Sequence, residues 1–481
     1  MAEYWEGRPT MEPTAWVPGL PLQMTVAAPD SNSDLVVSSS RGQQLKLVEE
    51  ESIDHHYAVE VFKQAERSFT EEHDRMKKKI HLFPPNMEDL KAKYAVPKAV
   101  SIGPYHHGRT AVIRQMESTK HVAAWHFIRD SGRLVEEVYG AVCAVADEAR
   151  THYEEDKMRT PSDDNFKPML FYDGCFLLQF MLHCMGGIED LVLEDAFNSN
   201  QISIGRDIVL LENQLPWVVV KVLMEFMSTP PDLEQFTIVW KSSLLPSVAF
   251  EHKRLEWDPT YKPPHLLQLL RFYIVGTTGH KKPEPKLSDK AKKLSISVSA
   301  IELAEMGIEL TAAKGTAELK EMEIEESWLT GKLSLAPLLL DDANASFLVN
   351  MAALELCTVP DFYSPDNFEE DSAVCSYLCL LGMVTDNVND VQELRKKGIL
   401  KGGSGLGDKE ALNLLNSLER HLRQGAHYLS TMILIANYKA SRKRRIKFHK
   451  FHYKNRTTII ATISAIGGLA GFLVTLKSQI S

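Results

Sequence analysis

The spacing of apolar residues along the chain predicts a mainly helical protein. From residue 53 onward apolar side chains recur at steps of three and four, beginning with Tyr57, Val61, Ala65 and Phe69, and this is the period of one helix face. The same spacing predicts helices within 119–128, 134–146, 297–307, 345–356, 373–394 and 415–433. Segments 171–185 and 208–227 are apolar nearly all round, so we expect helices in the middle of the fold there.

The predicted β content is small. Residues 328–340 alternate apolar and polar side chains and then end in a leucine run before Asp341 and Asp342, which is typical of a strand. We expect residues 308–310 to pair with this strand in a hairpin or small sheet.

The last apolar segment, 458–476, contains no charged residue. A bilayer core about 30 Å thick needs roughly 20 predominantly apolar residues of helix. We therefore expect a single C-terminal transmembrane helix, with a buried helix of a soluble fold as the alternative. Gly467 and Gly471 are spaced for close helix contact in a homodimer, although glycine is also common in such helices without any partner.

These patterns divide the chain into four parts. Residues 1–52 carry Pro, Gly and Ser without a sustained apolar period and are predicted to be a flexible leader. Residues 53–438 form the helical body, with an exposed loop near 277–293 that is rich in Lys, Pro and Gly. A basic juxtamembrane segment, 439–457, precedes the predicted transmembrane helix, 458–476.

Charge is distributed unevenly along the chain. The net charge is -10, from 54 Lys and Arg against 64 Asp and Glu, yet residues 439–481 hold ten Lys and Arg and no acid, which leaves 44 basic residues in 1–438. The acidic body argues against nucleic acid as the main partner.

The basic segment is predicted to lie against anionic lipid and to keep the body on the cytosolic side of a plasma membrane or endomembrane. The residues that we assign to the membrane surface are Arg442, Lys443, Arg444, Arg445 and Lys447.

The six cysteines do not resemble a disulfide framework. None forms a CxxC pair, and most lie in apolar runs, so we expect buried reduced thiols, with a metal or redox site as the alternative.

The sharpest local motif places two histidines between glycines. It consists of Ile102, Gly103, Pro104, Tyr105, His106, His107 and Gly108. Histidines that are adjacent in sequence rarely face one metal ion, and no HExxH spacing supports them. We expect a turn in which glycine supplies unusual backbone angles and histidine bonds nearby carbonyl groups.

Two further motifs place polar residues inside apolar runs. One comprises Glu212, Asn213 and Gln214, followed by Pro216, and the other is Asp173 with Gly174. Burial without partners would be costly, so these side chains must find hydrogen bonds, reach water or serve a site. We expect structural hydrogen bonding, with a pocket near His106, His107, Asp173 and Glu212 as the alternative.

Enzyme signatures are mostly missing from the sequence. The glycine-rich segment 401–408 lacks the Gly-Lys-Ser/Thr ending of a phosphate loop, and no GxSxG or kinase motif is present. The sequence therefore predicts no catalytic residue, no cofactor and no metal ligand.

Several motifs in order resemble one plant family, the plant family of unknown function number 247, also described as UPF0481-type membrane proteins. They are IGPYHHG (102–108), Met116-Glu117 with Lys120, DGCF (173–176), LLENQLP (210–216), His265-Leu266-Leu267, Asn350 with Glu355, Asp390-Val391 and the terminal apolar segment. The resemblance extends over about 53–476. Residues 81–95 depart from it, because they read Leu82-Phe83-Pro84-Pro85 where the family usually has Arg-Val-Pro.

The resemblance implies a mostly helical plant protein, usually with one transmembrane segment near its C-terminus and no established enzymatic activity. Some members resemble determinants of self-incompatibility in grasses. Our hypothesis is a non-enzymatic, membrane-anchored recognition or signalling component whose body binds an unidentified protein. The alternative is an uncharacterised enzyme with a pocket near the His106, His107 and Glu212 motifs.

Overall fold

The computed structural model describes residues 57–67, 76–159, 162–187, 191–246, 255–276, 298–313, 318–320, 322, 324–328, 330–362, 372–402, 405–455 and 457–464. The chain divides into two units, Met1–Phe69 and Thr70–Ser481. In the first unit, residues 57–67 form a helix whose side chains are exposed. The predicted leader, 1–52, and the predicted loop, 277–293, lie outside the described residues.

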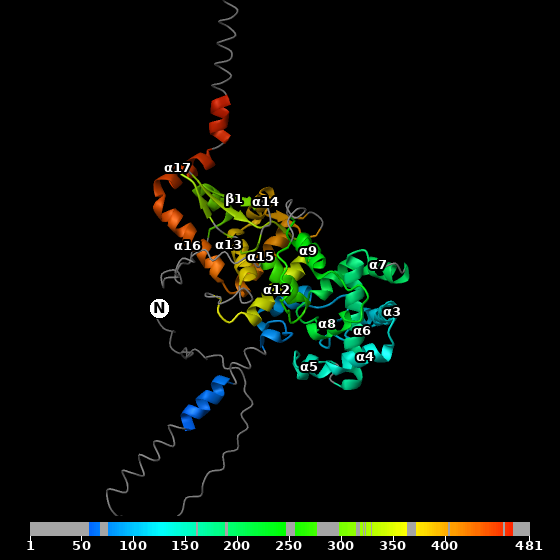
Figure 1. The fold of residues 1–481 in the computed structure, drawn as a ribbon. Helices are drawn as coiled ribbons and strands as arrows, with labels where there is room; N and C mark the ends of the chain where they lie inside the picture. Colours follow the sequence, from blue (N-terminus) through cyan, green and yellow to red (C-terminus); the bar gives the residue numbers. More distant parts are fainter. Residues whose placement is uncertain are drawn as a thin grey trace, which may run out of the picture. The chain divides into compact units, whose positions relative to one another are not determined.

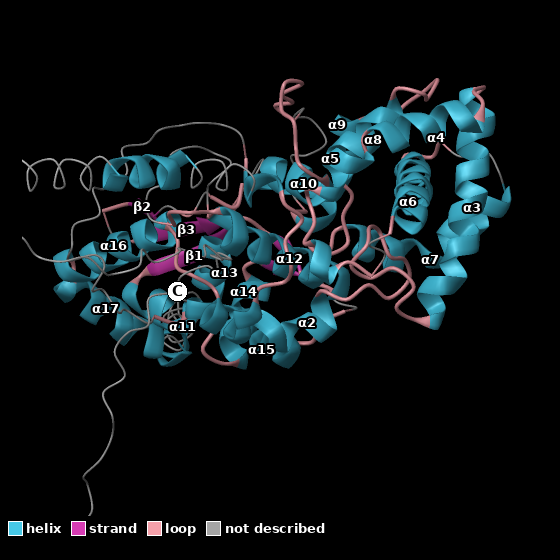
Figure 2. Cartoon of the chain, turned by 90° about the horizontal axis from the view of Figure 1, so that it is seen from below, coloured by secondary structure: helices cyan, strands magenta, loops and turns pink. Residues whose placement is uncertain are grey.

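Helix α6 (Asp163–Cys184) is the centre of a first group of helices in the second unit (Figures 1 and 2). It packs against α3 (Ala111–Ser131), α4 (Val135–Ala144), α7 (Leu191–Ile208) and α8 (Trp217–Met224). Its middle is buried nearly all round, as its apolar sequence predicts. Shorter elements in this part of the chain are η1 (Pro85–Met87), α2 (Glu88–Tyr94), α5 (Ala146–Arg150) and η2 (Glu155–Lys157).

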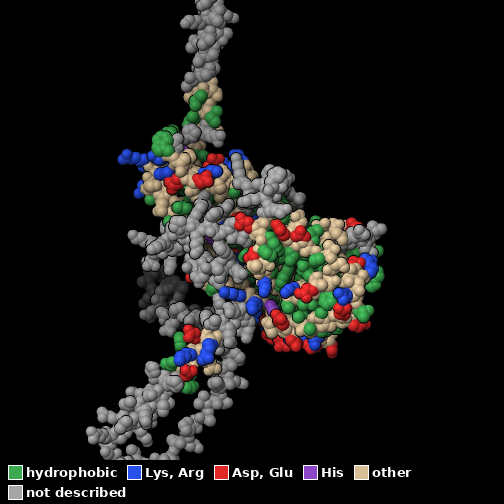
Figure 3. All heavy atoms as spheres, in the orientation of Figure 1, with side chains coloured by type: hydrophobic (Ala, Val, Ile, Leu, Met, Phe, Trp, Pro, Cys, Tyr) green, Lys and Arg blue, Asp and Glu red, His purple; other side chains and the backbone are tan. Residues whose placement is uncertain are grey.

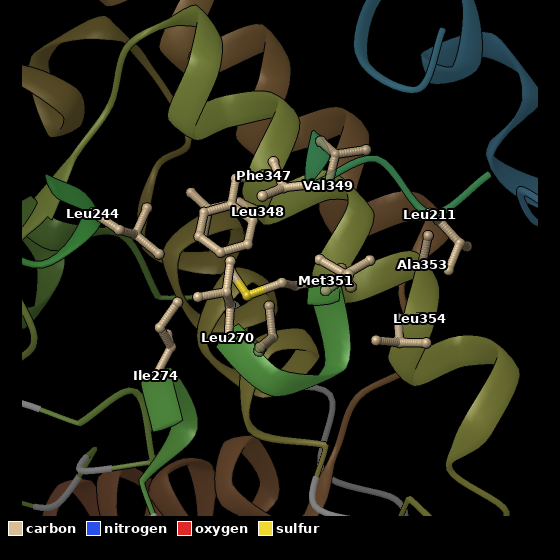
Figure 4. Close-up of a cluster of buried hydrophobic side chains, with 14 of the residues drawn as sticks. Leu211, Leu244, Leu270, Ile274, Phe347, Leu348, Val349, Met351, Ala353 and Leu354 are labelled. Carbon is tan, nitrogen blue, oxygen red and sulfur yellow. The ribbon is translucent and has the colours of Figure 1, made fainter. Parts of the chain in front are cut away.

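Helix α12 (Asp342–Thr358) lies in the middle of the core. It contacts α2, α7, α10 (Leu266–Val275) and α13 (Ala373–Val384), and α10 in turn packs on α9 (Leu233–Leu244). Figure 4 shows apolar side chains of α12 and α10, among them Phe347, Met351 and Leu270, meeting in one cluster. Because α12 is surrounded on several sides, its side chains are buried all round from Asn344 to Glu355.

The remaining helices pack around α13 and a small sheet. They are α11 (Ala300–Met306), α14 (Val388–Lys396), α15 (Asp408–His421), α16 (Ala426–Ser441) and α17 (Lys443–Lys454). Helices α15 and α16 contact α13, while α11 packs on the sheet and on α17. A capping box of Ser299 and Glu302 begins α11, and Gly307, with a φ of 83°, ends it.

The three-stranded sheet has the order β1-β3-β2. Strand β1 (Ile308–Ala312) runs parallel to β3 (Gly331–Leu335), with Leu310 opposite Leu333, and β2 (Ile324–Glu326) is antiparallel to β3. Strands β4 (Leu338–Leu339) and β5 (Leu400–Lys401) form a separate parallel pair. The pairing expected between 308–310 and the strand in 328–340 is therefore present, although its direction is parallel.

Three predicted helices are interrupted. Segment 208–227 contains the end of α7, a turn at 209–216 and α8; segment 373–394 contains α13 and most of α14; and segment 415–433 contains parts of α15 and α16. Each break has a local cause. Pro216 precedes α8, Asn387 caps α14 through its side chain, and Gly425 precedes α16.

The predicted C-terminal transmembrane helix is contradicted. In the part of the chain that the structure describes, no helix is both long enough and apolar enough to cross a bilayer. Of the predicted span, 458–476, only the residues up to 464 are described, in a helix that covers 457–464.

The assignments that depended on this helix are corrected with it. The single-pass, tail-anchored membrane localisation and the cytosolic orientation of the body lose their basis. Residues 465–481, including Gly467 and Gly471 of the predicted dimer contact, lie outside the described residues. Mainly helical secondary structure with few strands remains as the fold class.

Candidate functional site

The IGPYHHG motif lies in a loop, 95–110, that connects α2 to α3 and is largely buried from 99 to 106. A buried loop must find hydrogen-bond partners for its backbone groups. Here the partners are polar side chains of the other two motifs together with Arg206 and Asp207, so three motifs that are distant in sequence form one cluster. We call it the loop cluster, and it consists of the loop 95–110 with Asp173, Arg206, Asp207, Glu212, Asn213 and Gln214.

Asp207, at the end of α7, binds the first part of the loop. Its Oδ2 accepts hydrogen bonds from the amides of Lys98, Ala99 and Val100 at 2.8, 2.6 and 3.0 Å. Its Oδ1 faces Arg206 Nη1 at 2.9 Å. One carboxylate therefore satisfies three consecutive backbone donors, an arrangement that also binds small anions in other folds.

Arg206 reaches back to the same loop. Its guanidinium donates to the carbonyl oxygens of Lys93 at 2.9 Å and Val96 at 3.1 Å, and its Nε donates to Ser346 Oγ on α12 at 3.0 Å. The end of α2, the loop and α12 are thus connected through one side chain.

The Asn213 side chain both accepts a hydrogen bond from the middle of the loop and donates one to it. Its Oδ1 accepts from the amide of Ile102 at 2.7 Å, and its Nδ2 donates to the carbonyl oxygens of Val100 at 3.1 Å and Asp207 at 2.8 Å. All three bonds are buried, so nearly all of the hydrogen-bonding capacity of this side-chain amide is satisfied.

Gly103 has to be glycine for two reasons. Its φ is 77°, in the left-handed region, and a Cβ atom there would lie 2.6 Å from the carbonyl oxygen of Gln214. Its amide donates to Asp173 Oδ2 on α6 at 2.8 Å. Tyr153 OH donates to the same Gln214 oxygen at 2.9 Å, which fixes the point of closest approach.

Asp173 also forms a fully buried ion pair. Lys120 Nζ on α3 lies 2.6 Å from Asp173 Oδ1 and 2.8 Å from Glu117 Oε1. Burial alone lowers the pKa of Lys120, but attraction to Asp173 and Glu117 outweighs it and raises that pKa above its ordinary value. Burial raises the pKa of the Asp173 carboxyl in spite of the nearby Lys120. The close contact between Lys120 and Asp173 joins α3 and α6, and Asp173 also binds the loop.

His106 and Glu212 form a second charged contact of the loop cluster. His106 Nε2 lies 2.9 Å from Glu212 Oε2, while Lys91 Nζ and the amide of Phe83 each lie 2.8 Å from Oε1. Arg109 Nη1 lies 3.1 Å from His106 Nδ1. Because a guanidinium only donates, Nδ1 accepts from Arg109, and Nε2 faces the carboxylate.

The pKa of Glu212 reflects these donors. Burial by itself raises it, but the hydrogen bonds from His106, Lys91 and the Phe83 amide outweigh burial and lower the pKa to about 2. Glu212 is therefore a carboxylate that accepts from Lys91 and the Phe83 amide and lies close to His106, which weakens it as a proton acceptor near neutral pH.

Gln214 and the residues around it shape the turn between α7 and α8. Its Nε2 donates to the carbonyl oxygens of Ile208 at 2.7 Å and Leu210 at 2.9 Å, and its Oε1 accepts from the amide of Leu267 in α10 at 2.9 Å. Pro216 is the N-cap residue of α8. These bonds explain why an apolar run that suggested one helix contains a turn.

The other motif residues have contacts of the same kind. Tyr105 OH donates to the carbonyl oxygen of Ile80 at 3.1 Å, and the carbonyl oxygens of Pro104 and His107 accept from Arg159 at 3.0 and 3.1 Å. Gly108 has a φ of 62°. At Gly174 a Cβ atom would lie 2.3 Å from Leu223, so glycine lets α6 and α8 pack closely.

The five basic residues predicted to contact lipid separate into two sets. Arg442 donates to Glu326 Oε2 and to the carbonyl oxygen of Ser327, both at 2.8 Å, and Arg445 donates to the carbonyl oxygen of Trp328 at 2.6 Å. The side chains of Lys443, Arg444 and Lys447 are exposed.

Sequence reasoning did not single out Arg271 as a partner of Glu355. Arg271 on α10 and Glu355 on α12 form a buried ion pair at 2.7 Å, and Glu355 also accepts from the amides of Val374 and Cys375 at the start of α13. A charged residue inside an apolar run, as in LLQLLRFYIV, is the signal that could have revealed it.

The thiols give no sign of a redox or metal centre within the described residues. All six cysteines are free. No group of three or more His, Cys, Asp or Glu suited to a metal ion occurs in the described parts of the chain. Burial raises the pKa of the Cys175 thiol well above its ordinary value, which disfavours the nucleophilic thiolate.

Acid is expected to destabilise the protein in a defined pH window. Burial lowers the pKa of His81 to about 4, and burial together with the nearby His81 and His152 lowers that of His265 to about 3, from an ordinary value of 6.5. Between pH 6.5 and these lowered pKa values, the two histidines bind protons in the unfolded chain but not in the folded chain. The free energy of unfolding should therefore fall as the pH drops below 6.5, by up to about 1.4 kcal/mol per pH unit for each histidine. Below pH 4.5 Glu212 acts in the same direction.

Urea denaturation at pH 7 and pH 5 measures this effect. The matched variant is His265→Asn, because asparagine does not titrate and still accepts from the Gln268 amide at the start of α10. We expect a smaller pH dependence in the variant, whereas equal stability of the native protein at the two pH values would contradict the prediction.

Together these contacts define a helical protein in which separate motifs fix one buried loop against three helices. The family model described as "Plant protein of unknown function" matches residues 80–470. The chain therefore belongs to this plant family of unknown function, and the resemblance expected from the sequence is confirmed. A similar relative is UPF0481 protein At3g47200 of Arabidopsis thaliana, 27% identical over 345 residues that cover 67% of this chain and 68% of that protein. No solved structure matches the chain.

Proposed function

We propose that this protein is a non-enzymatic recognition or signalling component that binds another protein through one face of helix α3. The observation that carries the proposal is Trp125, whose side chain is 60% exposed on α3. Val122, one turn earlier, is 37% exposed, and the Arg129 guanidinium lies 5.1 Å from the centre of the Trp125 ring. We call Val122, Trp125 and Arg129 the α3 face.

The composition of the α3 face fits a protein partner. Tryptophan and arginine are enriched among the residues that dominate binding energy at protein interfaces. An aromatic ring buries a large area, and the arginine guanidinium can stack on it. The inner side of α3 fixes its position, because Ile113, Ala123, Ala124 and Phe127 are buried. The face is therefore held on a rigid helix rather than on a loop.

The loop cluster supports the non-enzymatic part of the proposal. Its carboxylates and amides bond backbone groups of the chain itself, as Asp207 does with three amides and Asn213 with three groups. A catalytic site needs side chains that are directed at a substrate. These side chains are directed at the loop instead.

The experiment compares two exposed apolar positions in the full chain. Trp125→Ala removes the centre of the α3 face, and Ile202→Ala, at a residue of α7 that is 79% exposed, is the matched control. Affinity purification from plant tissue should retain a defined partner with the native chain and with Ile202→Ala. With Trp125→Ala we expect affinity to fall about 30-fold, equivalent to roughly 2 kcal/mol.

Thermal unfolding of each variant checks that the fold is kept. Equal partner binding by both variants would remove the basis of the proposal. Turnover of a small-molecule substrate that is lost with Glu212→Gln but kept with Trp125→Ala would support the enzyme alternative instead.

A further inference from the structure

Helix α17 carries a concentrated positive charge in an otherwise acidic protein. Its twelve residues include Lys443, Arg444, Arg445, Lys447, Lys450 and Lys454 and no Asp or Glu. Exposed acidic residues lie on α4 and α5, and Figure 3 shows acidic side chains gathered over that region, away from the Lys and Arg side chains around α17. A basic helix is therefore attached to a body whose net charge is negative.

One side of α17 is fixed against α11. A Cβ atom on Gly307 would lie within 3.0 Å of the His449 ring, and Lys450 Nζ lies 3.0 Å from Glu305 Oε2. Ile446 is partly buried and packs on the core. These contacts determine which residues of the helix point outward.

The outward side combines aromatic and basic side chains. Phe448 is 67% exposed and Phe451 is 63% exposed, although both are large apolar residues. Arg444 precedes Phe448 by four residues and Lys447 precedes Phe451 by four, so the four side chains are neighbours on one face of the helix. We call Arg444, Lys447, Phe448 and Phe451 the α17 face.

A third exposed aromatic residue is held at the edge of this helix. Trp328, in the turn between β2 and β3, is 74% exposed. Arg445 donates to its carbonyl oxygen at 2.6 Å, and the Arg445 guanidinium lies 5.6 Å from the centre of the indole ring. Beyond α17, in the helical residues 457–464, Ile460 and Ile463 are also exposed.

We propose that the α17 face binds the surface of a bilayer that contains anionic lipid. Phe448 and Phe451 enter the region between headgroups and acyl chains, while Arg444 and Lys447 bind the phosphate and carboxylate groups of the lipids. Exposed Phe side chains beside Lys and Arg on one helix are a feature of helices that lie in the membrane interface. The helix lies along the surface, and the contact requires no membrane-spanning segment.

The charge distribution favours lipid as the occupant and sets its orientation. An anionic surface attracts the basic helix and repels the acidic body, so the α17 face turns toward the bilayer and the rest of the second unit turns away from it. The α3 face belongs to a different group of helices. The proposal therefore does not depend on the proposed function.

The test uses the full chain with two kinds of vesicle, one of phosphatidylcholine alone and one of phosphatidylcholine with phosphatidylserine. In a flotation assay the native protein should bind the vesicles that contain phosphatidylserine, and added salt should weaken this binding. The double variant Arg444→Glu/Lys447→Glu should weaken it by about tenfold or more. Phe448→Ser/Phe451→Ser should weaken binding and leave its dependence on salt.

The matched control is Arg133→Glu/Lys157→Glu, which changes the net charge equally at two exposed residues of the acidic body. Its binding should stay within about twofold of the native protein, since these residues lie outside the α17 face. Circular dichroism and thermal unfolding check the fold of each variant. Three results would each overturn the proposal: no binding of the native protein to either vesicle, equal binding to both vesicles, or equal losses in the control and the α17 variants. If neither vesicle is bound, an acidic protein becomes the partner to search for.

Discussion

Replacing Asp173 by alanine is expected to lower the free energy of unfolding by about 3–5 kcal/mol, because it leaves a buried lysine without its nearest counter-ion. Lys120 Nζ lies 2.6 Å from Asp173 Oδ1, and both side chains are buried. The substitution also removes the acceptor of the Gly103 amide. Urea denaturation followed by circular dichroism measures the loss.

Glu117→Gln is the matched control for this prediction. Glu117 bonds the same lysine at 2.8 Å but is partly exposed, so water can compensate for its loss and we expect a change of about 1 kcal/mol or less. Adding Lys120→Met to Asp173→Ala removes the unpaired cation and should restore part of the stability. A loss with Asp173→Ala no larger than that with Glu117→Gln would show that the buried pair does not stabilise the loop.

Replacing Glu355 by glutamine is expected to lower the free energy of unfolding by a similar amount, about 3–5 kcal/mol. The side chain keeps its size, but the buried Arg271 guanidinium, which lies 2.7 and 3.1 Å from Glu355 Oε1, loses its counter-charge. The amides of Val374 and Cys375 lose a charged acceptor at the beginning of α13. We expect faster amide hydrogen exchange in the first turn of α13 together with the lower global stability.

Glu325→Gln makes the same chemical change on the surface. Glu325 lies 3.5 Å from Lys332 and is exposed, so its loss should cost less than about 1 kcal/mol. If Glu355→Gln unfolds at the same urea concentration as Glu325→Gln, with unchanged exchange at Val374 and Cys375, the ion pair is not what holds α10, α12 and α13 together.

Local pattern predicted much of the fold. A period of three to four residues located most helices, since one buried face repeats at that spacing whatever the helix packs against. The apolar runs 208–227 and 373–394 were each predicted as one helix and are not. Hydrophobicity alone cannot show that Gln214 bonds the carbonyl groups of its own turn or that Asn387 caps a new helix.

The candidate site was predicted only in part. The sequence indicated that Asp173, Glu212, Asn213 and Gln214 need partners, because unpaired polar groups are costly to bury. It did not indicate which partners, since Asp207 and Val100 are 107 positions apart and become neighbours only in the folded chain.

The apolar C-terminal segment, 458–476, illustrates the same limit. Composition suggested a membrane-spanning helix, but no such helix occurs in the part of the chain that the structure describes. Composition did place the basic residues of α17 correctly in one short segment. Only the packing of His449 and Lys450 on α11 decided that Phe448 and Phe451 point outward.

The sequence by itself determined the family, the helical character and the residues that burial would require to be paired. These depend on the order of residues and on interactions within a few positions along the chain. The tertiary structure decided which charges meet, where helices stop and which faces stay exposed. Those outcomes depend on contacts between distant segments, whose free energies exist only once the chain has brought them together.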